Sequence, residues 1–419
     1  MARVHWGRWG VVAAAILAAL ALGTPAWAAC AIPGKTEIHF GGTVSLTGVF
    51  SDDGKWYKQV YDLWTEQVNA KGGILGCPVK MTILDDKSDA KTVVGLFEKL
   101  ITVDKVDILV SPWTSALVYA ASPVAEKFEK VLVEGGGCSE VIYSRGNKWI
   151  FNTMSATGNG HALGVFNWIK TLPPDKRPKT LANIYAESVW SIASADAARF
   201  FARDADMRLV VEEAYSLKTT DFTPMVQKIK AANADVVLLH SYFADTVQIV
   251  KTMRELKVNP KLLWSGAGSS HTNFPEVVGD LAEGIVTGSH VEPWMPFKGN
   301  KEFSEAFRKK YGKEVYDYPA VGYAALQALE QGITATKSLD QKVLQKYFRT
   351  ASFDLIMGPT RFTSTGAPSV QTLVEVQWQK GQDGKWKRVI YYPETDAYGL
   401  GIKVKTGDMK RLRGDLVSP

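Results

Sequence analysis

Long apolar runs are missing from almost the whole sequence, and this absence excludes a protein embedded in a membrane through most of its length. Beyond residue 22, no segment stays apolar over the ~20 residues that a transmembrane helix needs. Residues 11–22 are the exception, but this run is short, follows a basic start and precedes Ala26-Trp27-Ala28. Those features are typical of a secretory signal peptide. We therefore expect residues 1–28 to be removed, with cleavage after Ala29 as an alternative, and the mature protein to reach the periplasm.

Cysteine is scarce, with three residues in the chain, and this excludes a small disulfide-rich scaffold. An exported protein can still form one bridge. Cys30 lies just before the first predicted strand and Cys77 just before the second, so the two residues lie close together if these strands are parallel neighbours. We therefore favour a Cys30–Cys77 disulfide with Cys138 free, and three free thiols are the alternative. Lipid anchoring at Cys30 is a second hypothesis, but Trp27 stands where a lipid-attachment signal usually carries an aliphatic residue.

A strong excess of one charge is also absent. The full chain has 49 Lys and Arg against 43 Asp and Glu. Removal of the signal peptide takes away Arg3 and Arg8, which leaves 47 against 43 and a net charge of +4. The basic residues are scattered, apart from a locally basic stretch at residues 403–413, which we interpret as a solvated end. The charge pattern therefore predicts no nucleic-acid partner.

Motifs for catalysis, cofactors and metals are missing as well. The sequence has no G-x-S-x-G nucleophile turn and no H-E-x-x-H pair. Gly34-Lys35-Thr36 resembles the end of a phosphate-binding loop, but Ala29 stands where the first glycine is required. The histidines lack metal-ligand spacing, and Cys138 is better explained as a buried thiol than as a nucleophile. We predict that the protein is not an enzyme and has no cofactor or metal.

The sequence does contain a regular alternation of strand and helix patterns, in two series. The predicted strands lie at residues 37–46, 79–84, 106–110 and 131–134 in the first series and at residues 181–185, 208–214, 235–240, 261–265 and 284–289 in the second. Helices are predicted between them, including one that Asp89 would cap. Repeated β-α units of this kind predict an α/β fold with two doubly wound, Rossmann-like lobes.

The later segments indicate how the lobes are divided. Helices predicted at residues 301–311, 319–336 and 340–349 have no strand series of their own, so they complete lobes already begun. Residues 371–379 and 385–392 alternate like the strands of a β-hairpin. Crossings between the lobes are expected near residues 153–157, 291–296 and 358–365. We predict lobe 1 at residues 29–155 plus 292–360, lobe 2 at residues 156–291 plus 361–405, and a tail at residues 406–419.

Seven short runs occur in a familiar order along the chain. They are Val44-Ser45-Leu46-Thr47-Gly48, Asn69-Ala70-Lys71-Gly72-Gly73-Ile74, Asp85-Asp86, Ala121-Ser122-Pro123, Thr220-Asp221-Phe222-Thr223, Lys230-Ala231-Ala232-Asn233-Ala234-Asp235 and Tyr323-Ala324-Ala325-Leu326-Gln327-Ala328-Leu329. No single run is specific, but their order resembles the periplasmic binding proteins of the leucine/isoleucine/valine type, in the branched-chain amino-acid ABC transport family. The resemblance extends from about residue 36 to about residue 348.

This resemblance implies both a fold and a mode of action. The fold is the type I periplasmic binding protein, in which two lobes joined by three crossovers close on a ligand. The ligand would shift an equilibrium between open and closed forms through contacts made when both lobes meet. The partners implied are a small-molecule ligand and the membrane permease subunits of an ABC importer.

Ligands of open α/β sheets bind beyond the carboxyl ends of the strands, and two loops of lobe 1 lie there. Trp113, Thr114 and Ser115 follow one predicted strand, and Gly135 and Gly137 follow the next. The hydroxyl groups of this pair of loops, with backbone N–H groups around the glycines, could hold a carboxylate. In the family these loops grip the carboxylate of the ligand. The alternative is that a hydroxyl merely caps a helix and that Trp113 is an ordinary core residue.

The resemblance adds further residues to the predicted site. Trp190 and Tyr242 fall where the family places aromatic residues over the ligand, and Tyr318 is a weaker candidate. Phe50 and Asp53 lie in the loop after the first strand, which reaches the cleft in the family.

The predicted pocket departs from that of amino-acid binders. Ala267 aligns with the acid that holds the ammonium group of the ligand, and Gly137 aligns with a threonine of the carboxylate loop. A buried ammonium group without a counter-charge would be costly. We therefore predict a carboxylate-bearing solute, for which an aromatic acid would suit the flat walls. The alternatives are an amino acid or amide with a relocated ammonium anchor, at Asp245, Glu187 or Asp53, and a sensor subunit of a receptor.

Overall fold

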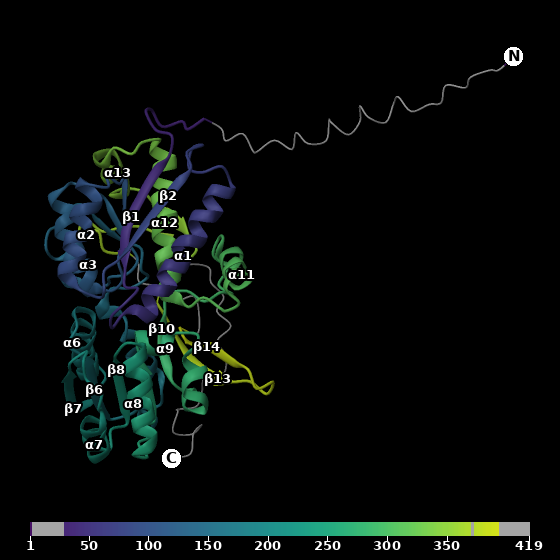
Figure 1. Cartoon of the computed structure of the whole chain (residues 1–419). Coiled ribbons are helices and arrows are strands. Elements are labelled where there is room, and N and C mark those ends of the chain that lie inside the picture. The colour runs from purple at the N-terminus through teal and green to yellow at the C-terminus, as the bar shows by residue number, and fades with distance from the viewer. Residues whose placement is uncertain (2–28, 370–372, 394–419) are drawn as a thin grey trace.

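A computed structural model describes Met1, residues 29–369 and residues 373–393. Within these residues the chain forms two α/β lobes, which lie one above the other in Figure 1. The predicted signal peptide after Met1 and the predicted tail lie outside the described residues. No helix in the described part of the chain is long and apolar enough to cross a membrane.

Lobe 1 is built on a five-stranded sheet in which every pairing is parallel, with the order β2-β1-β3-β4-β5. The strands are β1 (Ile38–Val44), β2 (Val79–Asp85), β3 (Ile108–Val110), β4 (Leu132–Glu134) and β5 (Ile150–Asn152). Strands β3, β4 and β5 are fully buried, as expected of parallel strands covered by helices.

The helices of lobe 1 come from two distant parts of the chain (Figure 1). Trp64 Nε1 donates to Glu330 Oε2 at 3.2 Å, and the Tyr323 hydroxyl donates to Gln67 Oε1 at 2.6 Å, so a late helix is fixed against an early one. The early helices are α1 (Ser51–Ala70), α2 (Ala90–Thr102), α3 (Ser115–Lys127) and α4 (Glu140–Tyr143), and the late ones are α11 (Asn300–Tyr311), α12 (Asp317–Thr336) and α13 (Gln341–Phe348). A small antiparallel pair, β11 (Phe353–Leu355) and β12 (Gly358–Thr360), follows them.

Lobe 2 is built on a seven-stranded sheet with the order β14-β13-β10-β9-β8-β6-β7. The parallel strands are β6 (Thr180–Ala186), β7 (Arg208–Tyr215), β8 (Val236–His240), β9 (Leu262–Ser265) and β10 (Val286–Ser289). The antiparallel hairpin of β13 (Val374–Lys380) and β14 (Trp386–Tyr392) extends one edge of this sheet, which confirms the predicted hairpin. The helices are α5 (Leu163–Thr171), α6 (Val189–Asp204), α7 (Thr223–Ala232), α8 (Phe243–Glu255), α9 (Ala267–Ser270) and α10 (Phe274–Val278), with short 3-10 turns η1 (Gly158–Gly160), η2 (Pro174–Lys176) and η3 (Gly279–Ala282).

Two sheets of this kind confirm the predicted fold class. Asp89 caps α2 as expected, because its carboxylate accepts from the N–H of Thr92 at 2.7 Å. The chain passes between the sheets after β5, after β10 and after β12. The residue bounds predicted for each lobe stay a prediction. Some short elements were not predicted from the sequence, and each of them has five residues or fewer: β5, α4, α9, α10, β11 and β12.

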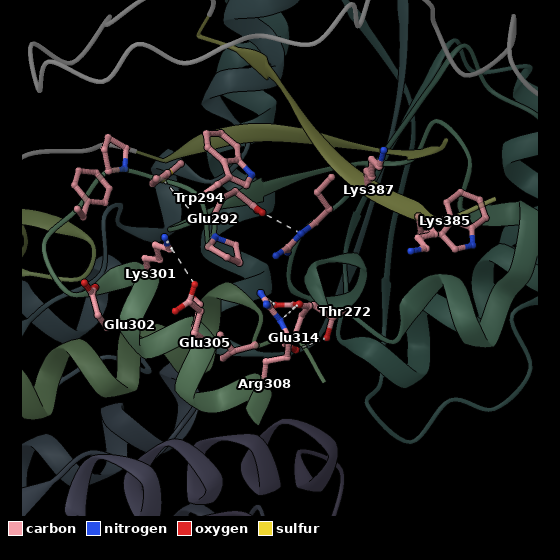
Figure 2. A pocket seen from close by; sticks show the side chains of 18 of the residues that line it. Thr272, Glu292, Trp294, Lys301, Glu302, Glu305, Arg308, Glu314, Lys385 and Lys387 are labelled. Atoms are coloured by element: carbon pink, nitrogen blue, oxygen red, sulfur yellow. Dashed lines mark hydrogen bonds and ion pairs between the residues drawn. The ribbon is translucent and has the colours of Figure 1, made fainter. Parts of the chain in front are cut away.

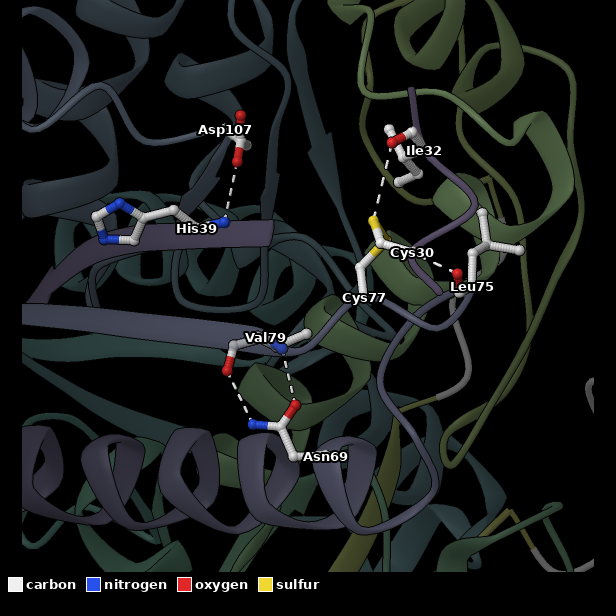
Figure 3. The surroundings of a disulfide bond; sticks show 8 residues. All are labelled: Cys30, Ile32, His39, Asn69, Leu75, Cys77, Val79 and Asp107. Atoms are coloured by element: carbon white, nitrogen blue, oxygen red, sulfur yellow. Dashed lines mark hydrogen bonds between the residues drawn. A yellow bond between two sulfur atoms is a disulfide. The ribbon is translucent and has the colours of Figure 1, made fainter. Parts of the chain in front are cut away.

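A disulfide ties the N-terminal segment to the start of β2. Cys30 is joined to Cys77 (Figure 3), which is the pairing that the sequence favoured, and β1 and β2 are indeed parallel neighbours. Beside the bridge, the Asn69 side chain makes two hydrogen bonds with the backbone of Val79, at 2.8 and 2.7 Å, so the end of α1 is also fixed to β2. Cys138 is free and buried.

Candidate functional site

The carboxyl ends of the parallel strands lead into loops where the two lobes meet. Strand β3 leads to Trp113, β6 leads to Trp190 at the start of α6, and β8 leads to Tyr242 just before α8. This is the usual ligand position in open α/β sheets, because the loops there carry backbone and side-chain groups that the sheets do not use. The contact region formed by these loops, with His161 and Tyr318, is called the interlobe interface below.

Five aromatic rings form a closed circuit across the interlobe interface. Ring centroids are 5.8 Å apart between Trp113 and Tyr242, 5.7 Å between Tyr242 and Trp190, and 5.5 Å between Trp190 and His161. Tyr318 closes the circuit, at 6.3 Å from His161 and 6.2 Å from Trp113. Each of the five side chains is at most 5 % exposed. Two rings come from lobe 1 and three from lobe 2, so the circuit exists only while the lobes are in contact.

Two further predicted residues, Phe50 and Ala267, lie beside this circuit. Phe50 contacts both Trp113 and Tyr242, with ring centroids 6.0 and 5.0 Å apart. Ala267 is buried at the start of α9, next to Gly266, where an added Cβ would lie 2.5 Å from the ring of Trp190. The interface therefore brings these residues together, and the alanine supplies no charge there.

Thr114 makes contacts in both lobes. Its Oγ1 caps α3 by accepting from the N–H of Ala116 at 3.4 Å, and it lies 3.4 Å from the hydroxyl of Tyr242. The same tyrosine hydroxyl lies 3.0 Å from Ser188 Oγ within lobe 2. The capping role that we considered as an alternative is therefore real, and the hydroxyl also faces the opposite lobe.

Ser115 connects the two predicted loops of lobe 1. Its Oγ accepts from the backbone N–H groups of Cys138 and Ser139, at 3.0 and 3.2 Å. The hydroxyl hydrogen of Ser115 is left for another acceptor, because a hydroxyl can donate once while it accepts twice. Ser139 Oγ, which the sequence analysis did not single out, is buried and has no hydrogen-bond partner among the described residues.

The glycine loop differs from expectation in one respect. A Cβ added at Gly135 would lie 2.4 Å from the backbone oxygen of Val321, so the loop packs tightly within lobe 1. The N–H groups of Gly136 and Gly137 both donate to Glu134 Oε2, at 2.8 and 2.6 Å. The N–H of Gly137, which we expected to hold a ligand, already has a partner within its own lobe. In the neighbouring loop, the hydroxyl hydrogen of Ser115 is not committed in this way.

The nearby carboxyl groups are buried and already bonded. Asp53, which the sequence placed in a loop, lies in the first turn of α1 and accepts a hydrogen bond from the Tyr316 hydroxyl. Burial raises the pKa of Asp53 to about 7, and burial raises the pKa of Glu134 to about 7 as well. Within the described residues, no three His, Cys, Asp or Glu side chains gather in a way that could hold a metal ion.

Sequence reasoning missed three buried nitrogen atoms at or beside the interface. Trp190 Nε1, His161 Nε2 and His290 Nε2 have no hydrogen-bond partner in the described part of the chain. Burial lowers the pKa of His161 to about 3 and the pKa of His290 well below its usual value, so both rings are neutral at pH 7. Trp190 was predicted as an aromatic wall, but its N–H group and the two histidines gave no signal, because spacing along the chain does not reveal them.

A separate cavity of about 1170 Å³ opens beside the crossing that follows β10 (Figure 2). Helix α11 of lobe 1 forms one wall, the C-terminal hairpin of lobe 2 forms another, and the crossing segment with Trp294 adds a third. Arg388 also lines it, with Nε 3.3 Å from Glu292 Oε1. None of the site residues predicted from the sequence lines this cavity. We propose the interlobe interface as the candidate functional site because the strand ends, the aromatic circuit and the unpartnered nitrogen atoms meet there.

Comparison with known proteins finds relatives along most of the chain. A family model described as "Periplasmic binding protein" matches residues 37–384. The Leu/Ile/Val-binding protein homolog 7 of Brucella abortus is 24% identical over 396 residues, which cover 90% of this chain and 97% of the relative.

Solved structures of solute-binding proteins share the fold. One is a solute-binding protein of an ABC transporter from Rhodopseudomonas palustris, in complex with 3,4-dihydroxybenzoic acid, with a TM-score of 0.76, 18% identity, and coverage of 85% of this chain and 97% of that chain. Another is the substrate-binding protein of a branched-chain amino acid transporter from Streptococcus pneumoniae, in complex with isoleucine, with a TM-score of 0.74, 20% identity, and coverage of 84% and 99%. At these identities the likeness concerns the fold.

Proposed function

Since the chain belongs to the periplasmic binding protein family, we propose that it captures a small carboxylate-bearing solute between its lobes and delivers it to the permease subunits of an ABC importer. The solute is bound and released unchanged, so the protein takes part in transport and not in catalysis. Export to the periplasm and recognition of the closed form by the permease are parts of this proposal.

One observation carries the proposal: the interlobe interface combines buried aromatic walls with neutral hydrogen-bonding groups from both lobes. Thr114 and Ser115 place hydroxyl groups beside Trp113, and Trp190 adds an unpartnered N–H from the other lobe. Flat rings suit the apolar body of an organic acid, and hydroxyl and N–H groups suit its oxygen atoms. The 3,4-dihydroxybenzoic acid in the Rhodopseudomonas palustris protein supports an aromatic acid as the solute.

Two carboxyl groups near the interface, those of Asp53 and Asp245, are poorly suited to hold an ammonium group. Asp53 is bonded to Tyr316, and Asp245 accepts from the Tyr215 hydroxyl at 3.1 Å. Burial raises the pKa of Asp53 to about 7 and the pKa of Asp245 to about 6, which weakens each as a fixed negative charge. Since Ala267 supplies no acid, a simple α-amino acid would bury its charge without a partner. This favours an organic acid, although the Streptococcus pneumoniae protein contains isoleucine.

Capture requires the lobes to separate and close again, because the interface residues are buried in the closed form. Polar contacts already join the lobes: Thr114 lies against Tyr242, and the N–H of Asn159 donates to Glu140 Oε1 at 2.7 Å. A solute that touches both lobes adds contacts that exist in the closed form alone, so it shifts the equilibrium toward closure.

A thermal-shift screen of the mature protein tests the proposal. We expect at least one organic acid, from a set containing benzoate, 3,4-dihydroxybenzoate and short-chain acids, to raise the melting temperature, since a ligand at 100 times its Kd stabilises the folded state by about 2.7 kcal/mol. Leucine and valine should have little effect, and benzamide serves as the matched control without a carboxylate. A large shift with leucine and none with any acid would contradict the proposal.

A further inference from the structure

The lobe 2 side of the interlobe interface carries buried nitrogen atoms that lack hydrogen-bond partners. Trp190 is 4 % exposed and His161 is 2 % exposed, and their rings lie 5.5 Å apart. Trp190 Nε1 and His161 Nε2 have no hydrogen-bond partner in the described chain. Buried polar groups nearly always have a partner, because leaving one without a partner costs free energy. Two adjacent exceptions at a place where a ligand is proposed indicate that the ligand supplies the missing partner.

The histidines beside this place can adapt to either kind of partner. His161 Nδ1 lies 3.4 Å from the Tyr318 hydroxyl, and His290 Nδ1 lies 2.8 Å from Ser155 Oγ. A hydroxyl group can donate or accept, so each neutral imidazole can present its Nε2 as an acceptor or as a donor. The rings of His161 and His290 are 5.2 Å apart, which makes His290 a second layer next to His161. The indole of Trp190 can only donate.

These nitrogen atoms belong to lobe 2, whereas the loop proposed for the carboxylate belongs to lobe 1. In the aromatic circuit, His161 is not adjacent to Trp113: Tyr318 separates them on one side, and Tyr242 with Trp190 separates them on the other. A solute held by Thr114 and Ser115 therefore meets His161 and Trp190 with the part that faces lobe 2. An apolar group there would leave the donors unpaired, and an ammonium group cannot accept from an indole N–H.

We propose that His161 and Trp190 recognise an oxygen atom on the part of the solute that faces lobe 2, so that the solute is an acid with a second oxygen function. This inference rests on the proposed function and narrows the class of substrate. A hydroxyl group suits the place well, because it accepts from the indole N–H and exchanges a hydrogen bond with a neutral imidazole. A second carboxylate shares the acceptor chemistry, and the test distinguishes the two.

The test compares acids of matched shape by isothermal titration calorimetry with the mature protein. The aromatic set is 4-hydroxybenzoate, 4-methylbenzoate and terephthalate, and the aliphatic set is 5-hydroxypentanoate, hexanoate and adipate. In at least one set, we expect the compound with the second oxygen function to bind at least about tenfold more tightly than the compound with the methyl group.

The His161→Phe variant keeps a ring without nitrogen, and it should reduce this preference to about threefold or less, as should Trp190→Phe. His39→Phe, in β1 away from the circuit, is the matched control and should keep the preference.

The outcomes separate this inference from the proposed function. Equal binding of the oxygen-bearing and methyl compounds by the wild-type protein would overturn the inference and leave the proposed function standing. A preference that persists in full in both His161→Phe and Trp190→Phe would overturn the assignment to these residues. Tightest binding of terephthalate or adipate would support the inference with a carboxylate as the oxygen function. Absence of binding by every acid in both sets would overturn the inference. A variant that fails to fold does not affect the comparison made with the wild-type protein.

Discussion

Ser115 stabilises its loop whether or not a ligand is bound. Its Oγ accepts from two buried N–H groups, those of Cys138 and Ser139. Ser115→Ala would leave both donors unpaired, and we expect the free energy of unfolding to fall by about 1–3 kcal/mol in urea denaturation of the ligand-free protein. Ser122→Ala is the matched control on the same helix, because this buried hydroxyl makes a single hydrogen bond, to the Tyr119 oxygen at 3.2 Å. Equal losses in the two variants would contradict the assigned role.

Some interface residues were predictable one by one and others were not. Trp113, Trp190 and Tyr242 follow strands whose ends could be located in the sequence. The resemblance to the periplasmic binding proteins then indicated that these residues face the ligand. His161 and Tyr318, which make the 3.4 Å contact, are 157 positions apart in the chain, so no local spacing brings them together. The pairing of the Gly137 N–H with Glu134 was also invisible, because it depends on how the loop folds back on the end of its own strand.

Strand β14 carries a buried charge that joins the two lobes at the crossing segment. Arg388 Nε lies 3.3 Å from Glu292 Oε1, and Arg388 Nη1 lies 3.9 Å from Asp317 Oδ1 in α12, with each of the three side chains at most 5 % exposed. Arg388→Met would leave two buried carboxyl groups without their cation. We expect the free energy of unfolding at pH 8 to fall by about 3–5 kcal/mol. Lys387→Met, at the next position of the same strand with an exposed side chain, should change it by about 0.5 kcal/mol or less.

The same substitution should become less harmful in acid. Burial raises the pKa of Asp317 to about 7 and raises the pKa of Glu292, and removal of the arginine would raise both further. A carboxyl group whose pKa is higher in the folded state than in the unfolded state takes up its proton on folding, so its cost is greatest above the folded-state pKa and disappears below the unfolded-state pKa. The loss in Arg388→Met should therefore be smaller at pH 5 than at pH 8. A loss independent of pH would show that these carboxyl groups do not cause it.

At the scale of elements, length decided what the sequence revealed. Helix α2 was predictable because Asp89 caps it and apolar residues recur along its 13 residues. Strand β5 and helix α9 have three and four residues, which is too short for a period of two or of 3.6 to become visible. Strands β3 and β4 also have three residues, but they lie in largely apolar runs, at residues 106–110 and 131–134, that the sequence did reveal. The C-terminal hairpin was predictable because its alternation spans two strands of seven residues each. Its addition to lobe 2 depends on pairing with β10, which is set by tertiary contacts.

At the scale of the whole molecule, we expect buried histidines between the lobes to link closure to pH. His271 of lobe 2 packs against Trp56 of lobe 1 and Phe243 of lobe 2, with ring centroids 5.0 and 4.4 Å apart, and burial lowers the pKa of His271 to about 3. A histidine whose pKa is lowered in the closed form contributes fully to closure above pH 6.5, which is the pKa of an exposed histidine. This contribution is lost as the pH falls below 6.5. Each histidine that opening exposes therefore shifts the equilibrium by up to about 1.4 kcal/mol per pH unit. Lys313 and Arg388 act in the same direction on His271, whereas Asp53, whose pKa is raised by burial, would oppose the shift if opening exposed it to water.

Small-angle X-ray scattering of the ligand-free protein can measure this response. We expect the radius of gyration to increase between pH 7.5 and pH 5.5, because acid favours the open form. His271→Phe should reduce the increase, since phenylalanine keeps the ring contacts and cannot take up a proton. His240→Gln is the control, because His240 is bonded to Ser194 and Asn183 within lobe 2 and should not report on opening. A radius that is the same at both pH values in the wild-type protein would contradict the link.

The bridge between Cys30 and Cys77 also bears on how the protein meets its partner. One sulfur atom cannot be part of a disulfide and of a thioether at the same time, so a chain oxidised in this way has no lipid attached to the sulfur atom of Cys30. If the protein serves an importer as proposed, such a molecule would reach it by three-dimensional diffusion. The frequency of their encounters would then rise in proportion to the number of copies in the compartment.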